Sequence, residues 1–179
     1  ALSQALETKD SLLVSWLKPV DDIPAFINCQ YLFIRLPEVF YCSVTKNLIT
    51  EWIDKILSRK RVTVSGNKPL RLIGMHLLVQ MTAAAALKCL ANPGFDRTYK
   101  LAANGETSLF ELVGFIHSTL ARLLPNHNFA KLIFAEEEPV RLSEEFDTSF
   151  MENFNVILPG WRTGVEETIV AYLVHRKLF

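Results

Sequence analysis

Short apolar runs alternate with segments of helical periodicity along this chain, and this alternation constrains its fold more than any other feature. Three of the runs are closed by a proline, a glycine or a polar turn, which is typical of strands. They span residues 31–36, 61–66 and 98–103. Strands that alternate with helices indicate an α/β fold. Because the strands are few and the second half is mostly helical, we expect the chain to form part of a larger sheet.

The helical segments carry recognisable starts and stops. Helices are predicted over residues 3–18, 46–59, 79–90, 108–124 and from 163 towards the C-terminus. The clearest is 46–59, where apolar residues share one face and polar residues fill the other. Four consecutive alanines in 79–90 would let that helix pack closely against a sheet. Capping boxes at Ser108 and Thr163 open the last two helices, and residues 125–160 are expected to be irregular.

Charge and cysteine content limit the kinds of partner. The chain has 19 basic and 19 acidic residues, and this balance argues against a protein that binds nucleic acid by neutralising phosphates. Cys29, Cys42 and Cys89 lack C-x-x-C spacing, which favours free thiols in a reducing, intracellular compartment. No stretch approaches the roughly 18 apolar residues of a membrane span. We therefore expect protein partners that bind through an apolar surface, with no nucleic acid and no membrane span.

Glycine and histidine spacing argues against the common cofactor sites. The seven glycines never lie close enough together to form G-x-G-x-x-G or G-x-x-x-x-G-K-[ST], so no nucleotide cofactor is expected. The four histidines do not occur as H-x-x-x-H or H-E-x-x-H, and no metal site is expected. A G-x-S-x-G elbow is missing, and sequence places no histidine beside Cys42. No catalytic residue is assigned.

Four segments, in order, resemble the extended short-chain dehydrogenases/reductases, the nucleotide-sugar epimerase-like group. Tyr31–Phe40 is similar to that family's strand–Arg–x–Pro–x–x–Val–(Tyr/Phe) segment. Val79–Pro93 resembles its V-D-D helix, and Tyr99–Leu112 resembles its (Y/F)-N-(I/L)-G-x-G-E-x-x-S-x-x-E-L segment. Pro159–Glu167 is similar to the start of its terminal helix. The resemblance covers roughly residues 30–179.

The resemblance implies an architecture and a cleft. It implies one domain over residues 1–179, with a helix-and-loop lead-in at 1–30 and a substrate domain at 31–179. The implied fold is a partial Rossmann-type sheet edge with a mainly helical C-terminal subdomain. In the family, the loop after the first of these strands borders the substrate cleft. The residues that would border such a cleft here are Arg35, Phe40, Tyr41 and His76.

The chain departs from the family at the positions that perform its chemistry. The family uses Tyr-x-x-x-Lys, in which the lysine lowers the pKa of the phenol. No tyrosine of this chain has a lysine four residues later, and Gln4 stands in the likeliest lysine position. The paired acids of V-D-D are replaced by Gln80 and Met81. With the glycine-rich turn missing as well, these losses indicate a non-catalytic descendant or a half-molecule.

Three hypotheses follow. The first is a non-catalytic structural or interaction subunit of a larger assembly, with an exposed apolar patch where the missing strands of the sheet would pack. One branch, the reductase-like accessory subunit of mitochondrial respiratory complex I, is similar around Leu109–Val113 and Val174–Lys177 and implies a mitochondrial location. The second is the substrate-binding half of an NAD(P)-dependent reductase or epimerase whose nucleotide-binding half is on another chain or missing. The third is a small α/β domain unrelated to this family.

Overall fold

The computed structural model describes most of the chain after its first strand begins. The described residues are 32–37, 39–41, 46–58, 61–66, 69–91, 97–135 and 148–178. The predicted helix at 3–18 lies outside them, as do Cys29 and Cys42. Cys89 is a half-buried free thiol.

Parallel strand pairs and helices confirm the predicted α/β class. The parallel pairs are β1 (Leu32–Arg35) with β6 (Arg97–Lys100), β2 (Val39–Tyr41) with β5 (Leu72–Gly74), and β3 (Val62–Val64) with β8 (Leu132–Phe134). An antiparallel pair joins β4 (Pro69–Leu70) to β7 (Thr107–Ser108). The helices are α2 (Leu48–Leu57), α3 (Met75–Ala91), α4 (Leu109–Leu123), α5 (Ser149–Phe154) and α6 (Trp161–His175).

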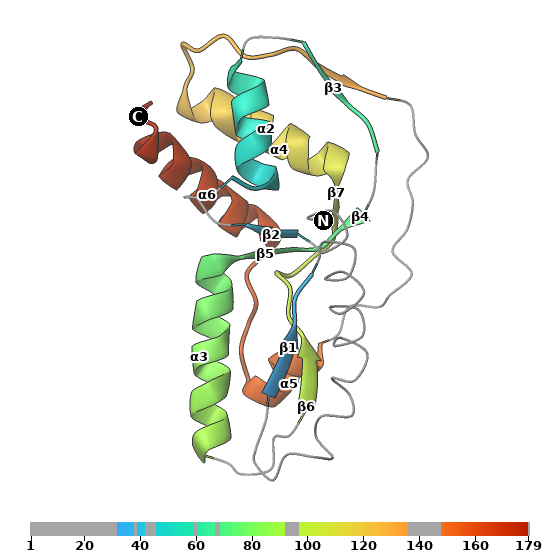
Figure 1. Cartoon of the computed structure of the whole chain (residues 1–179), viewed down its shortest axis with the longest axis vertical. Coiled ribbons are helices and arrows are strands. Elements are labelled where there is room, and N and C mark those ends of the chain that lie inside the picture. Colours follow the sequence, from blue (N-terminus) through green and yellow to red (C-terminus); the bar gives the residue numbers. More distant parts are fainter. Residues whose placement is uncertain are drawn as a thin grey trace, which may run out of the picture.

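The elements form two groups that meet at the β2–β5 pair (Figure 1). Helices α2, α4 and α6 pack against one another in the first group. Ile53 of α2, Leu120 of α4 and Ile169 of α6 are fully buried in its core. The second group joins β1, β6, α3 and α5. Its core centres on Tyr99, whose ring lies edge-on to Phe150 at a centroid distance of 5.7 Å.

Helix α2 begins where local hydrogen bonds can satisfy its first backbone donors. The Asn47 side chain accepts from the backbone N–H groups of Ile49 and Thr50, at 2.9 Å and 3.2 Å. The Thr50 hydroxyl accepts in return from the N–H of Asn47 at 2.9 Å. This reciprocal box satisfies donors that the helix cannot pair internally. The helix predicted over 46–59 is therefore confirmed, two residues shorter at each end.

Helix α3 begins at Met75, four residues before the predicted start at Val79. Leu77 and Leu78 pack against the second core, and this burial extends the helix back to the end of β5. The expected close packing of the alanine run was largely wrong, because only Ala85 of the helix is buried. The exposed part of the run shares a face with exposed apolar residues. Within the described residues, no helix combines the length and the apolar character needed to cross a membrane.

The strand predicted at 31–36 is present as β1, and its Leu32, Phe33 and Ile34 are half-buried. Two further differences come from contacts between distant segments. The segment 125–160, expected to be irregular, contains β8 and α5. The short strands β4 and β5 were not predicted, because each pairs with a strand from a remote part of the sequence.

Helix α6 begins two residues before the predicted capping box. It starts at Trp161, with Gly160 as its N-cap and no side-chain hydrogen bond to the cap. The backbone of Asn104 takes that role: its carbonyl accepts from the N–H of Trp161 at 3.2 Å, and its N–H donates to the carbonyl of Pro159 at 2.9 Å. Because Trp161 is buried against Phe115, packing sets the first residue of the helix. By contrast, the Ser108 hydroxyl does accept from the N–H of Glu111, as its capping box predicted.

Candidate functional site

A cavity of about 540 Å³ lies where β5 runs into α3 and the start of α6 comes alongside. One wall is the turn from Gly74 to Leu77, with Gln80 one turn further along α3. The opposite wall is the first three turns of α6, from Gly160 to Ala171. Its size falls in the range of ordinary small-molecule pockets, which is about 300–1,000 Å³.

His76 is the sequence-predicted residue that lines this cavity. It is exposed in the first turn of α3, and its Nε2 lies 3.0 Å from the side-chain amide nitrogen of Gln80. This contact between residues one helical turn apart restrains the ring beside the cavity.

The α6 wall is shaped by two glycines one helical turn apart. Gly160 and Gly164 have no side chains, so the backbone of α6 itself borders the cavity. Thr163 and Glu167 add a hydroxyl and a carboxylate to the same wall. The hydroxyl of Thr168 is already used, since it donates to the carbonyl of Gly164 at 2.9 Å.

The other sequence-predicted cleft residues lie on two different strands, Phe40 and Tyr41 on β2 and Arg35 on β1. The backbone of Tyr41 pairs with Gly74, and that of Phe40 pairs with Ile73, which places the end of β2 next to the cavity. The placement of their side chains is outside what the structure describes. Arg35 ends β1 on a different strand pair, where its carbonyl accepts from the N–H of Leu101 at 3.0 Å. The structure therefore brings Tyr41 and His76 to neighbouring positions and leaves Arg35 apart.

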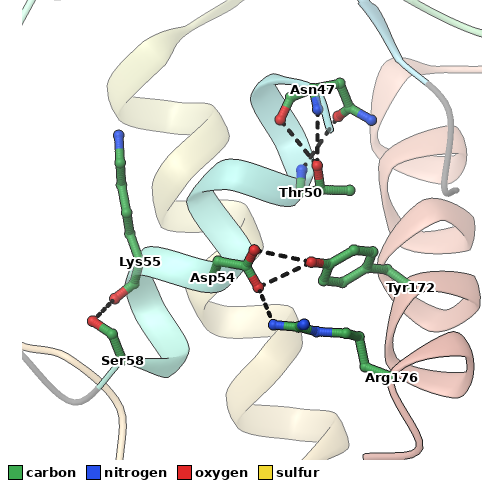
Figure 2. A network of polar contacts seen from close by, with 7 residues as sticks. All are labelled: Asn47, Thr50, Asp54, Lys55, Ser58, Tyr172 and Arg176. Atoms are coloured by element: carbon green, nitrogen blue, oxygen red, sulfur yellow. Dashed lines mark hydrogen bonds and ion pairs between the residues drawn. The ribbon is translucent and has the colours of Figure 1, made fainter. Parts of the chain in front are cut away.

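Polar contacts hold the α6 wall against the helices behind it (Figure 2). The Tyr172 hydroxyl lies 3.0 Å from both carboxylate oxygens of Asp54 on α2, and the Arg176 guanidinium donates to the same carboxylate at 3.0 Å. Arg162 also pairs with Glu111 of α4. These groups are substantially exposed, so each ion pair contributes at most about 1 kcal/mol. Their main effect is to fix the orientation of α6.

Burial is the main cause that raises the pKa of Tyr172 above its ordinary value. The hydrogen bond to Asp54 and the negative charge of that carboxylate raise the pKa further, while the Arg176 charge opposes them. The neutral phenol is thus the form that the native state favours.

The lining has polar groups that can hold a ligand by hydrogen bonds. It offers hydrogen-bonding groups from His76, Gln80 and Thr163, and one carboxylate from Glu167. Of the side chains that the structure describes, neither a tyrosine nor a lysine lines the cavity. Among the residues that the structure describes, no group of histidine, cysteine and carboxylate side chains is arranged to hold a metal ion.

Sequence reasoning missed the α6 wall, although a signal was present. The Pro159–Glu167 segment was recognised as the start of a terminal helix, without a place in the cleft. Its two glycines, one helical turn apart, were the available clue, since helix-forming segments rarely repeat glycine at that spacing without a packing reason.

The sequence matches no protein-family model and no curated protein. Solved structures do match. The dTDP-4-dehydrorhamnose reductase of Bacillus anthracis, in complex with NADP, has a TM-score of 0.63 and 18% identity over 84% of this chain and 51% of its own. The UDP-glucose 4-epimerase of Thermus thermophilus, in complex with NAD, has a TM-score of 0.62 and 10% identity, covering 88% and 51%. The UDP-N-acetylglucosamine 4-epimerase of Bacillus cereus has a TM-score of 0.60 and 14% identity, covering 84% and 47%.

This chain therefore spans about half the length of the reductases and epimerases that it resembles. At these identities the likeness concerns the fold. It confirms the Rossmann-like α/β architecture that the sequence segments implied.

Proposed function

We propose that this chain is a non-catalytic interaction subunit of a larger assembly, built on one half of a reductase–epimerase fold. The observation that carries the proposal is the outer face of α3, defined as Met75, His76, Val79, Gln80, Ala83, Ala86, Leu87 and Leu90. All eight residues are exposed. Val79, Leu87 and Leu90 keep 57%, 69% and 81% of their surface in contact with solvent.

An exposed apolar face of this kind is unusual for a monomeric protein that binds no partner. Single exposed apolar residues are common, but a continuous apolar strip on one helix marks a contact surface. Apart from His76, the outer face has no ionisable side chain. Lys88 belongs to the other side of α3, where its ammonium donates to the carbonyl of Asn153 at 2.7 Å. The face is thus an exposed apolar surface on a helix, whereas the first sequence hypothesis expected such a patch where the missing strands of the sheet would pack.

The sequence supports the non-catalytic part of the proposal. It contains neither Tyr-x-x-x-Lys nor a glycine-rich phosphate loop. In reductases of the resembled family, those two features supply the proton transfer and the nucleotide site. A chain without them, and with the fold of one half, is suited to binding rather than to hydride transfer.

Nucleotide binding and turnover test this proposal directly. The purified chain is titrated with NAD⁺, NADP⁺ and their reduced forms by calorimetry, with the Bacillus anthracis reductase as a positive control. It is then assayed for conversion of UDP-glucose and dTDP-4-dehydrorhamnose. We expect no nucleotide binding below millimolar concentration and no turnover. Saturable nucleotide binding with turnover would refute the non-catalytic role.

A mitochondrial assembly is one setting for such a subunit. The similarity of Leu109–Val113 and Val174–Lys177 to the reductase-like accessory subunit of respiratory complex I supports it. The half-buried free thiol of Cys89 is compatible with a reducing, intracellular compartment. Fractionation of cells that express the tagged protein checks this location, and recovery of the tag in a secreted fraction would contradict it.

A second function is favoured by the cavity beside α3 and α6. In this second function, the chain is the substrate-binding half of an NAD(P)-dependent reductase or epimerase whose nucleotide-binding half is on another chain or missing. The hydrogen-bonding groups of His76, Gln80 and Thr163 suit the hydroxyl groups of a sugar. The similar structures include an epimerase from Thermotoga maritima with bound UDP-glucose.

Filling the cavity separates this second function from the first. Gly164→Leu places a side chain in the cavity, and Ala121→Leu on the exposed surface of α4 is its matched control. If the second function holds, UDP-glucose raises the melting temperature of the wild type and of Ala121→Leu, and at least about tenfold more ligand is needed for Gly164→Leu. A sugar site here would be rejected if UDP-glucose raised the melting temperatures of all three proteins equally, or if it raised none of them.

A further inference from the structure

We propose that Asn104–Gly105 is a site of spontaneous deamidation, at which the asparagine is converted by water to aspartate and isoaspartate. The inference goes beyond the proposed function and does not depend on it. Asn104 is the one asparagine of the chain that is followed by a glycine. The pair lies between β6 and β7 and is hydrogen-bonded to the start of α6, so a covalent change there reaches the wall of the cavity.

The reaction needs only these two residues and water. The backbone nitrogen of Gly105 loses its proton and attacks Cγ of Asn104, which forms a new N–Cγ bond. The Cγ–Nδ2 bond breaks, and the amide group takes up a proton and leaves as ammonia. Water then opens the resulting cyclic imide. Cleavage of its bond to Cγ gives aspartate, and cleavage of its bond to the main-chain carbonyl carbon gives isoaspartate, in which the backbone passes through Cβ and Cγ.

Both reacting groups are accessible in the fold. Asn104, Gly105 and the following Glu106 are all exposed. Within the described part of the chain, neither the Asn104 side chain nor the Gly105 N–H forms a hydrogen bond. Gly105 has no side chain that would keep its nitrogen away from Cγ, whereas every other asparagine of the chain is followed by a larger residue. Accessibility and the small neighbour therefore coincide at Asn104.

The fold opposes the reaction with one hydrogen bond. Asn104 forms a strand-like bridge with Gly160, and its carbonyl accepts from the N–H of Trp161 at 3.2 Å. In extended backbone the next nitrogen lies away from Cγ, so the Asn104–Gly105 peptide must rotate and give up that bond. Gly105, at φ of +88°, can absorb the rotation because glycine tolerates either sign of φ. Loss of one exposed hydrogen bond lowers the reactive population by up to about tenfold.

Isoaspartate should loosen the first turn of α6. It adds one atom to the main chain at Asn104, whose N–H and carbonyl are bonded to Pro159 and Trp161, so both bonds cannot keep their geometry. The N-cap of α6 makes no side-chain hydrogen bond that could replace them. Loss of a capping interaction should lower the melting temperature by about 2–4 °C. Because Pro159 and Gly160 line the cavity, the product also alters the shape of that wall.

Peptide mapping of the aged full chain tests the site. The protein is incubated at mildly alkaline pH in water enriched in a heavy oxygen isotope, since hydrolysis of the imide takes its oxygen from the solvent. We expect the peptide that contains Asn104 to acquire the label as both aspartate and isoaspartate. Asn128 is the internal control, because it is exposed, lies outside the helices and strands, and is followed by Phe129. Its peptide should stay unlabelled over the same time.

Two comparisons make the test quantitative. The same incubation in urea gives the rate of the unfolded chain, and the native rate should lie within about tenfold of it. A larger difference, equal labelling at Asn128, or aspartate without isoaspartate would overturn the proposal. Asn104→Gln keeps an amide whose longer side chain does not readily close the ring, so its melting temperature should stay constant while that of the wild type falls. Equal falls in both proteins would overturn the effect on α6.

Discussion

Two glycines in different backbone conformations should respond to alanine with opposite signs. Gly105 has φ of +88°, in the left-handed region that side chains disfavour. A Cβ there would lie 3.6 Å from Cδ1 of Trp161, an ordinary contact, so the cost is backbone strain alone. An alanine at this φ costs about 1–2 kcal/mol of backbone strain. The less flexible unfolded chain offsets about 0.4–1 kcal/mol of that cost. Gly105→Ala should therefore lower the free energy of unfolding by about 1 kcal/mol.

Gly114 lies within α4, and a Cβ there would meet nothing within 4 Å. Gly114→Ala should therefore raise the free energy of unfolding by about 0.5–1 kcal/mol, the usual gain inside a helix. The two variants should differ by about 1.5–2 kcal/mol. For a chain of this length, that corresponds to roughly 3–8 °C between their melting temperatures.

Urea unfolding followed by circular dichroism measures both variants, with unchanged m-values as the sign that only stability has moved. Gly66→Ala is the control for the conformational argument. Gly66 has φ of +80° and open space around its Cβ position, so it should be destabilised like Gly105. The reasoning is refuted if Gly105→Ala is as stable as the wild type, or if Gly114→Ala is less stable.

Other substitutions test the packing of α2 against α6. Burial and Asp54 raise the pKa of Tyr172, so the native state holds the phenol proton more tightly than the unfolded chain does. The free energy of unfolding should therefore fall as pH rises through about 10. Tyr172→Phe should flatten this fall when unfolding is measured by urea titration at alkaline pH. Asn47→Ala should cost about 1 kcal/mol by loss of the cap, and Asn47→Gly only a few tenths; equal losses would contradict capping. Ile53→Ala should cost about 2–5 kcal/mol in thermal unfolding, and a loss below about 1 kcal/mol would show that Ile53 is poorly packed.

Elements whose signals are local were predicted well. The apolar spacing of α2 and the Ser108 capping of α4 involve residues within a few positions of each other, so the sequence carries them directly. The start of α6 was misplaced because the signal that decides it is remote. Asn104, which precedes even α4 in the sequence, supplies the carbonyl that receives the N–H of Trp161. The capping box at Thr163 predicted the wrong start because the local sequence does not show that the Asn104 carbonyl is available to Trp161.

The local sequence carries little information about how the candidate site is assembled. His76 lines the cavity, and the roles of His76 and Tyr41 in a substrate cleft stay predictions. The opposite wall comes from α6, the last helix of the chain, and no pattern within either segment indicates that they meet. Arg35 was grouped with the others because the resembled family segment contains it together with Phe40, yet β1 and β2 pair with different strands.

The sequence by itself determined the α/β class, most of the helices, and a likeness to reductase and epimerase segments, because periodicity, capping and turn residues act over a few positions. Only the tertiary structure decided the strand partners, since each parallel pair joins strands with at least one helix between them in the sequence. It also decided which side of α3 is left in solvent. That helix is apolar on nearly all sides, so its periodicity carries no preference. Its inner side is the one that β5 and α5 cover, and contacts between distant segments made that choice.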